Sequence, residues 1–184
     1  RALNPQLLLG CTLGALIIAI PLGLGAAIFL SEIAGTRLRE IAKPVIELLA
    51  GIPSVVYGLF GMAFLAPLVR QWFGVDTGLN VFTASLILGV MIVPVICSMG
   101  EDALSSVPKN LREASLALGA TRAETIFKAV VPAAKSGLAG SVLMGFGRAV
   151  GETMVVLVVA GGAARIPGSI FDPARPLTST IAAE

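Results

Sequence analysis

The sequence has no histidine, only two cysteines and few aromatic residues, and each of these shortages excludes something. A Ser-His-Asp triad cannot form without histidine, and Cys11 and Cys97 both lie in apolar runs with no plausible set of metal ligands around them. We therefore expect both thiols to be buried as small hydrophobic groups, and we expect no metal site. The scarcity of aromatic residues argues against a transmembrane β-barrel, which carries girdles of such residues at both membrane interfaces.

Charge is also scarce, since 13% of the residues are Asp, Glu, Lys or Arg, whereas about a quarter is usual in a soluble domain. Aliphatic residues and glycine dominate instead, which is typical of closely packed membrane helices. The basic residues are spread among polar connections, so nucleic acid is not an expected partner. The sequence contains no Gly-x-x-x-x-Gly-Lys-Ser/Thr phosphate loop and no paired carboxylates, so we expect neither an ATPase, nor another enzyme, nor a cofactor.

Four runs are apolar enough to cross a lipid bilayer, for which a helix needs about 20 residues. They cover residues 7–30, 45–69, 77–100 and 136–164, and Pro53 is among the residues that interrupt the second run. Such interruptions are tolerated where neighbouring helices satisfy the freed backbone groups, so we expect one helical transmembrane domain over residues 1–184. Because the chain opens with Arg1 and ends without a closing span, we expect flanking spans to be missing.

The distribution of lysine and arginine predicts the orientation in the membrane, because cytoplasmic connections carry an excess of both. The connections after the first and third runs hold Arg37, Arg39, Lys43, Lys109, Arg112, Arg122, Lys128 and Lys135. The opposite side holds Arg1, Arg70, Arg165 and Arg175. We therefore expect the first connection and the loop 101–135 to be cytoplasmic, and residues 165–184 to form an external loop.

The loop 101–135 is too long and too patterned to be a simple link. Gly119 is well placed as a C-terminal helix cap, and Thr121 with Glu124 matches a capping box that starts a second helix. Pro132 should end or bend that second helix. The pattern predicts two short helices joined at a glycine, which either lie on the membrane as an amphipathic hairpin or press small side chains against a partner.

The residues of this loop resemble a known family. The run Glu113, Ala114 and Ser115, followed by Gly119 and then Pro132, is similar to the EAA loop of the membrane subunits of ABC importers. The spacing matches that pattern, and Ser115 stands where a second alanine is usual. In that family the loop is a coupling helix that docks into a groove of the ATP-hydrolysing subunit. The resemblance therefore implies that these five residues form an ATPase-coupling surface.

Longer strings extend the resemblance over nearly the whole chain. They are ELLAGIPSVVYGLFG (47–61), LREASLALGATRAETIFKAVVPAAKSG (111–137) and GRAVGETM (147–154), and they look like the permeases of phosphate-specific importers. Tyr57 and the string FDPARPLT are closer to the PstC-type subunit than to its PstA-type partner. The resemblance implies an all-α integral membrane protein with the MetI-like helical bundle of type I ABC importers and a cytoplasmic coupling helix.

The same resemblance implies a location and a set of partners. The location is the cell inner membrane, crossed several times and in contact with the lipid bilayer. The partners would be a dimer of the ATP-binding ABC subunit, a second phosphate permease subunit of the PstA type, and a periplasmic or surface phosphate-binding protein.

Arg148 and Glu152 lie inside the fourth apolar run, where each charge costs about 2.5–3.5 kcal/mol even on lenient insertion scales. On a continuous helix they would lie one turn apart, near the bilayer midplane, on a face shared with Ser141 and Gly145. One interpretation is a self-neutralising pair that pins the helix to a neighbour. The other is a strip that lines the translocation path, where the guanidinium binds phosphate oxygens and the carboxylate weakens that binding so that the anion is released.

The function that these patterns predict is that of a membrane-spanning permease subunit of an ATP-driven phosphate importer, with ATP hydrolysis left to a separate subunit. One alternative is a permease for another oxyanion such as sulfate or molybdate. A second alternative is a channel or an ion-coupled secondary transporter, in which the two buried charges would act as a charge relay.

Overall fold

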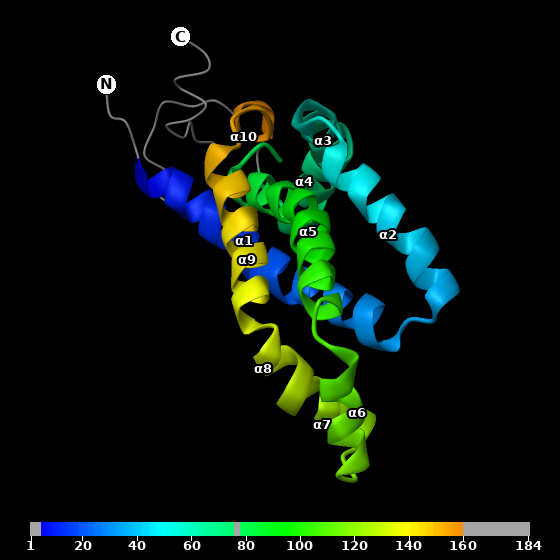
Figure 1. Cartoon of the computed structure of the whole chain (residues 1–184). Coiled ribbons are helices and arrows are strands. Elements are labelled where there is room, and N and C mark those ends of the chain that lie inside the picture. Colours follow the sequence, from blue (N-terminus) through cyan, green and yellow to red (C-terminus); the bar gives the residue numbers. More distant parts are fainter. Residues whose placement is uncertain (1–4, 76–77, 160–184) are drawn as a thin grey trace.

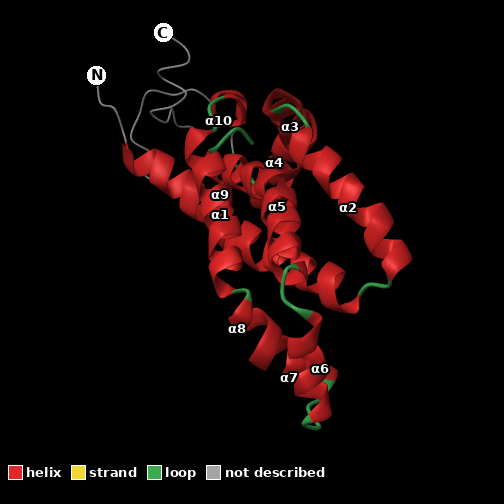
Figure 2. Ribbon diagram, in the orientation of Figure 1, coloured by secondary structure: helices red, strands yellow, loops and turns green. Residues whose placement is uncertain are grey.

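The computed structural model describes residues 5–75 and 78–159, and every regular element in these two ranges is a helix (Figures 1 and 2). In chain order the elements are α1 (Pro5–Ile28), η1 (Phe29–Ile33), α2 (Thr36–Gly51), α3 (Ser54–Phe60), η2 (Gly61–Leu65), α4 (Ala66–Phe73), α5 (Val81–Ser105), α6 (Lys109–Ala117), α7 (Arg122–Thr125), η3 (Ile126–Val130), α8 (Val131–Ala133), α9 (Lys135–Gly151) and α10 (Met154–Val159), where η marks a π-helical turn. The expected external loop 165–184 lies outside the described residues.

Three of the described helices are long and apolar enough to cross a membrane: Gly10–Ile33, Ser54–Phe73 and Val81–Ser105. A fourth candidate is the bent pair Arg122–Ala133 and Lys135–Gly151, whose two parts meet at 71°. This bend follows Pro132 closely and separates the helices of the loop 101–135 from α9.

Helix α5 forms the centre of the bundle, with α1 and α9 packed along it (Figure 1). Its start is fixed by Asn80, whose side-chain oxygen accepts a hydrogen bond from the backbone N–H of Thr83 at 2.9 Å. Small residues let the helix axes approach, because a methyl group added at Gly89 would lie 3.1 Å from the carbonyl oxygen of Ala15. Small residues at helix contacts are the usual means of packing helices in a bilayer, where lipid removes the hydrophobic drive to associate.

Two clusters of buried hydrophobic side chains hold the bundle together. The larger one joins α1, α5, α9 and α10 around the fully buried Leu88, Met91 and Ile92. The smaller one includes Leu104 at the end of α5 and Val130 of η3, so it anchors the base of the 101–135 segment to the bundle. Cys11 belongs to the first cluster and Cys97 to the second, and both thiols are free and buried, as expected.

The second and fourth expected runs are broken helices. Residues 45–69 include the extended residues Ile52 and Pro53, which separate α2 from α3. In the fourth run α9 ends at Gly151 and α10 starts at Met154, because Glu152 adopts φ −76° and ψ 124°, outside the helical region. The expectation that Arg148 and Glu152 share one face of a continuous helix is therefore wrong.

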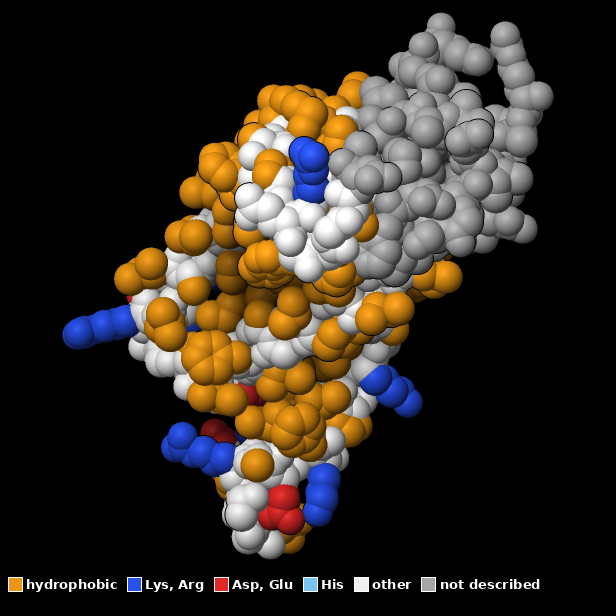
Figure 3. Space-filling model, turned by 180° about the vertical axis from the view of Figure 1, so that it is seen from behind, with side chains coloured by type: hydrophobic (Ala, Val, Ile, Leu, Met, Phe, Trp, Pro, Cys, Tyr) orange, Lys and Arg blue, Asp and Glu red, His pale blue; other side chains and the backbone are white. Residues whose placement is uncertain are grey.

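Helices α6 and α7 project from one end of the bundle as a hairpin (Figure 1). Seen from behind, hydrophobic side chains cover most of the body, whereas acidic and basic side chains gather mainly toward the end that carries this hairpin (Figure 3). The distribution fits a body that faces lipid and an end that faces water.

Candidate functional site

The turn between α6 and α7 is built by local backbone hydrogen bonds. Gly119 has a φ of +85°, a left-handed conformation that glycine adopts without steric cost. Its N–H donates to the carbonyl of Leu116 at 3.0 Å, and the N–H of Ala120 donates to the carbonyl of Ser115 at 3.3 Å. These two bonds form a Schellman motif, so the C-terminal cap expected at Gly119 is confirmed.

The start of α7 is held by the expected capping box. The N–H of Glu124 donates to the hydroxyl oxygen of Thr121 at 3.3 Å, and the N–H of Thr121 donates to the Glu124 carboxylate at 3.0 Å. Hydrogen bonds from the backbone and hydroxyl of Thr121, together with the ammonium of Lys128, lower the pKa of Glu124 to about 2. The turn therefore has a fixed geometry although it lies in solvent.

The expected ATPase-coupling residues occupy different parts of this hairpin. Glu113 and Ala114 are exposed on α6, and Pro132 is exposed at the base of the second arm. The hydroxyl of Ser115 lies 3.0 Å from that of Thr125, so this residue joins α6 to α7 and does not simply leave room for a partner. Leu118, at the tip, is 90% exposed. A rigid hairpin with an apolar tip is suited to insertion into a complementary groove.

Arg112 fastens α6 to the bundle. Its Nη2 lies 2.7 Å from Oε1 of Glu32, which belongs to η1 at the end of α1. The same guanidinium donates to two backbone carbonyls, at 2.8 Å to Leu104 and at 2.5 Å to Val107. Three segments of the chain therefore meet at one side chain.

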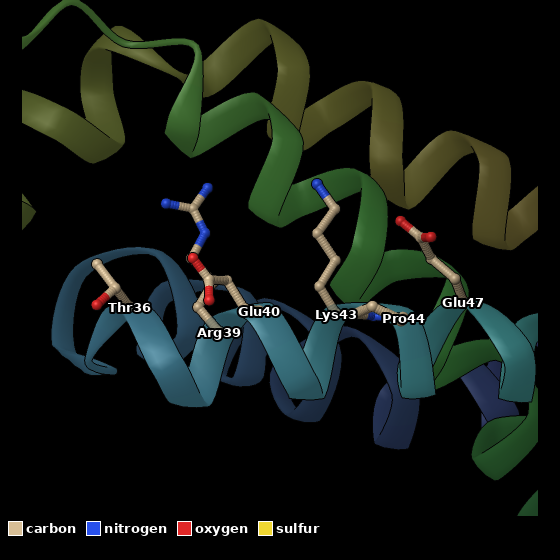
Figure 4. Close-up of a pocket in the computed structure, with 6 residues that line it drawn as sticks. All are labelled: Thr36, Arg39, Glu40, Lys43, Pro44 and Glu47. Carbon is tan, nitrogen blue, oxygen red and sulfur yellow. The ribbon is translucent and has the colours of Figure 1, made fainter.

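A second ionic cluster joins α2 to α5. Glu101 of α5 is 1% exposed, and it forms ion pairs with Arg39 and with Lys43 of α2, the latter at 2.9 Å. The hydroxyl of Ser105 donates to the same carboxylate at 2.6 Å, and Lys43 also pairs with Asp102. The hydrogen bond to Asp102 is the largest cause that raises the pKa of Lys43, and the hydrogen bond to Glu101 raises it further. Figure 4 shows Arg39 and Lys43 extending from α2 toward α5, along a groove.

Helices α3 and α10 lie against each other, and each follows one of the two helix breaks. The carboxylate of Glu152 accepts hydrogen bonds from the N–H groups of Met154 at 3.0 Å and Val155 at 3.2 Å, so it caps the start of α10. Arg148 is half-buried in the last turn of α9, close enough to Tyr57 of α3 for an electrostatic interaction. The two expected pathway residues therefore flank one helix break and belong to different backbone environments.

The part of the chain that the structure describes contains no group of three or more His, Cys, Asp or Glu side chains that could hold a metal ion. Several of its charged side chains instead join one helix to another.

Comparison with known proteins identifies the family. Residues 19–176 match the family model described as binding-protein-dependent transport system inner membrane component. The chain belongs to this family of membrane transport components. It is thus a multi-pass inner membrane component with the fold expected from its sequence, an all-helical bundle of the MetI-like type.

Relatives of this membrane component include proteins named as transport permeases. It is 46% identical over 170 residues to the probable ABC transporter permease protein YqgH of Bacillus subtilis (strain 168), and it is 40% identical over 189 aligned positions to the phosphate transport system permease protein PstC of Pasteurella multocida (strain Pm70). Each match covers 92% of the chain, which spans 55% and 59% of the length of these relatives.

A solved structure shares the fold of this membrane component. The inward-facing form of the MetNI methionine ABC transporter aligns with a TM-score of 0.66 and 26% identity, covering 79% of this chain and 68% of the solved chain. The resemblance to ABC importer permeases, derived from the loop and the longer strings, is thereby confirmed at the level of family and fold.

Sequence reasoning missed the acidic residues that join the helices of this membrane component. Glu32 and Glu101 each lie near the hairpin end of an apolar helix, and their partners are 80 and more than 55 residues away in the chain. A single carboxylate at the end of an apolar run, opposite a basic connection, is a usable signal for such a pair. It does not reveal which basic residue is the partner.

Proposed function

We propose that this chain is the transmembrane part of a permease subunit in an ATP-driven phosphate importer. The proposal is supported by its family, whose description is of binding-protein-dependent transport, and by several similar proteins named as phosphate transport system permeases. The expected spans 7–30, 45–69, 77–100 and 136–164 would form the path, with the loop 101–135 in the cytoplasm.

The projecting hairpin is the observation that carries the ATP-driven part of this proposal. Its tip is apolar and exposed, and its turn is fixed by the Schellman motif and the capping box. A rigid, solvent-exposed hairpin moves as one body when its tip is displaced, so it can carry that displacement to the bundle. A flexible loop would absorb the displacement by bending. Glu113, Ala114, Ser115, Gly119 and Pro132 would form or shape the surface that docks into the ATP-binding subunit dimer.

Arg148 is the residue proposed to contact phosphate. A guanidinium keeps its charge and offers a planar fork of donors that matches two oxygens of an oxyanion. It lies beside the break before α10 and near Tyr57, where backbone is no longer purely helical. Irregular backbone at membrane depth is tolerated where it is buried or lines a cavity. Glu152, held by the amides of α10, would place a negative charge near the anion and keep its binding weak.

The remaining partners follow from this function. A second permease subunit of the PstA type would complete the path, and a periplasmic or surface phosphate-binding protein would deliver the anion. The ATP-binding subunits would supply the energy, since the chain has no phosphate-binding loop of its own.

Uptake of labelled phosphate by the full-length protein, assembled with its partners in proteoliposomes, tests the proposal. Phosphate should enter only with ATP, and excess sulfate or molybdate should not compete. Competition by either anion would point to the other-oxyanion alternative, and uptake without a copurified ATPase would point to a channel or an ion-coupled transporter. An Ala114→Trp variant should uncouple ATP hydrolysis from uptake, because the large side chain falls on the docking surface while the left-handed turn at Gly119 is kept.

A further inference from the structure

The hairpin touches the bundle in two different ways. Its second arm is anchored by apolar packing, because Val130 of η3 is fully buried in the cluster that contains Leu104. Its first arm, α6, has no buried residue, and all of its residues are described. Apart from its covalent link to α5 through residues 106–108, this arm is attached to the transmembrane helices by polar contacts, and Arg112 makes three of them, two to Glu32 and one to Leu104.

The geometry at Arg112 is that of a forked donor. Nη2 and Nε reach the two carboxylate oxygens of Glu32 at 2.7 and 3.4 Å, while Nη1 and Nη2 also donate to the carbonyls of Val107 and Leu104. A bidentate pair fixes orientation as well as distance. A lysine could reach the carboxylate, but its point charge could not serve all of these acceptors.

The ion pair between Arg112 and Glu32 is largely shielded from water. The side chains of Arg112 and Glu32 are 22% and 9% exposed, whereas the ion pair between Lys128 and Glu124 on the same hairpin is 76% and 45% exposed. Exposed pairs of the second kind contribute little. The Arg112–Glu32 pair is bidentate and less exposed, so solvent screens it less than the Lys128–Glu124 pair.

Both acceptor segments are ends of long bundle helices. Glu32 lies on η1, which continues α1, and its Oε1 also accepts a hydrogen bond from the hydroxyl of Ser31 at 3.1 Å. Leu104 belongs to the last turn of α5, and α1 and α5 pack along each other. A movement of α6 therefore acts on α1 through this side chain, and on α5 both through this side chain and through the covalent link 106–108. A groove lined by Ser105, Lys109 and Glu113, among others, lies beside the pair.

We propose that Arg112 is a positioning residue for energy coupling, which transmits displacement of α6 to α1 and α5 by way of Glu32 and the end of α5. The proposal rests on the function proposed above and names the joint through which docking at the hairpin reaches the transmembrane helices. Arg112 acts here on its own chain and not on the ATPase.

The test compares variants of the full complex in proteoliposomes, with ATP hydrolysed per phosphate taken up as the readout. Arg112→Gln and Glu32→Gln should each raise this ratio by about threefold or more, and Arg112→Lys should raise it less. The double variant should be no worse than either single variant, because both remove the same joint. Lys128→Gln, which breaks only the exposed pair of the hairpin, is the matched control and should leave the ratio unchanged.

Assembled complex is measured for each variant, so that a folding defect is separated from a coupling defect. An unchanged ratio in Arg112→Gln, with normal phosphate uptake, would overturn the inference and leave the proposed function intact. Additive effects of the two single variants would also overturn it. The wild-type complex tests the proposed function by itself, because failure to take up phosphate there would overturn that function together with the inference that rests on it.

Discussion

The buried carboxylate of Glu101 should make α2 more sensitive to loss of its basic side chains than to loss of the acid. Every residue of α2 is described and none is buried, although Ala42 and Ile46 pack partly buried against the smaller cluster, so Arg39 and Lys43 supply the ionic part of its attachment to α5. Glu101 is 1% exposed, whereas the two basic side chains are 36% and 31% exposed. In Arg39→Gln/Lys43→Gln the acid would stay buried without a cation. In Glu101→Gln the freed cations could turn to water.

The expected magnitudes differ accordingly. Leaving a buried charge without its partner costs about 3–5 kcal/mol, so the double variant should open α2 readily. Glu101→Gln should cost only about 1–2 kcal/mol, because the amide can keep the hydrogen bond from Ser105 and no charge remains buried. The triple variant, which combines all three changes, should recover part of the loss because it removes the uncompensated charge.

Hydrogen exchange of the α2 amides, measured by mass spectrometry on the purified protein, reports this local opening. The double variant should exchange at least about a hundredfold faster than the wild type, since each 1.36 kcal/mol is a factor of ten. Lys128→Gln serves as the control and should leave α2 unchanged. If Glu101→Gln accelerated exchange of the α2 amides as much as the double variant does, this would refute the premise that the buried, unpaired carboxylate is the main cost in the double variant.

Three further predictions concern the helix break and the hairpin. Arg148→Gln should remove most phosphate uptake from a complex that still assembles and hydrolyses ATP, whereas Arg148→Lys should keep part of the uptake. Near-normal uptake per assembled complex in Arg148→Gln would contradict the proposal that Arg148 binds phosphate in the translocation path. Glu152→Ala should destabilise the start of α10 by about 1 kcal/mol, whereas Glu152→Gln should destabilise it less because the amide keeps an acceptor oxygen. Equal hydrogen exchange of the α10 amides in both variants would count against the capping role of Glu152. The hydrogen bonds that lower the pKa of Glu124 to about 2 contribute stability above the ordinary pKa of a glutamate and lose it as the pH falls through about 2. Thr121→Ala removes the hydroxyl but keeps the backbone N–H, so it should raise that pKa only part of the way in a carboxyl NMR titration, and an unchanged pKa would exclude the Thr121 hydroxyl as a contributor.

The hairpin could be predicted from sequence because its signals are local. Gly119 and the Thr121–Glu124 box act within six residues, and the structure has both the left-handed glycine and the reciprocal cap. Local backbone geometry of this kind depends little on the rest of the fold.

The break at Glu152 could not be predicted in the same way. Neither Glu152 nor its two neighbours is a proline, and the low helix propensities of Gly151 and Thr153 are too weak a signal to end a helix inside an apolar run. Helix α9 ends there, and the carboxylate of Glu152 accepts hydrogen bonds from two backbone amides at the start of α10. The long-range pairs were missed for a related reason: which carboxylate meets which cation is decided by helix packing, and the four runs alone leave many pairings open.

The capping role of Glu152 has a consequence for how the chain enters the membrane during synthesis. The amides that bind its carboxylate belong to Met154 and Val155, which are synthesised after it. If α9 entered the lipid alone, the carboxylate would therefore lack these two hydrogen bonds, which makes its insertion costly. We therefore expect α9 and α10 to partition into the lipid together, as a single unit, once Val155 has emerged from the ribosome. A nascent chain stopped after residue 152 should integrate less efficiently in a glycosylation-mapping assay than one stopped after residue 159. Equal integration of the two lengths would show that the acid finds another partner on the way in.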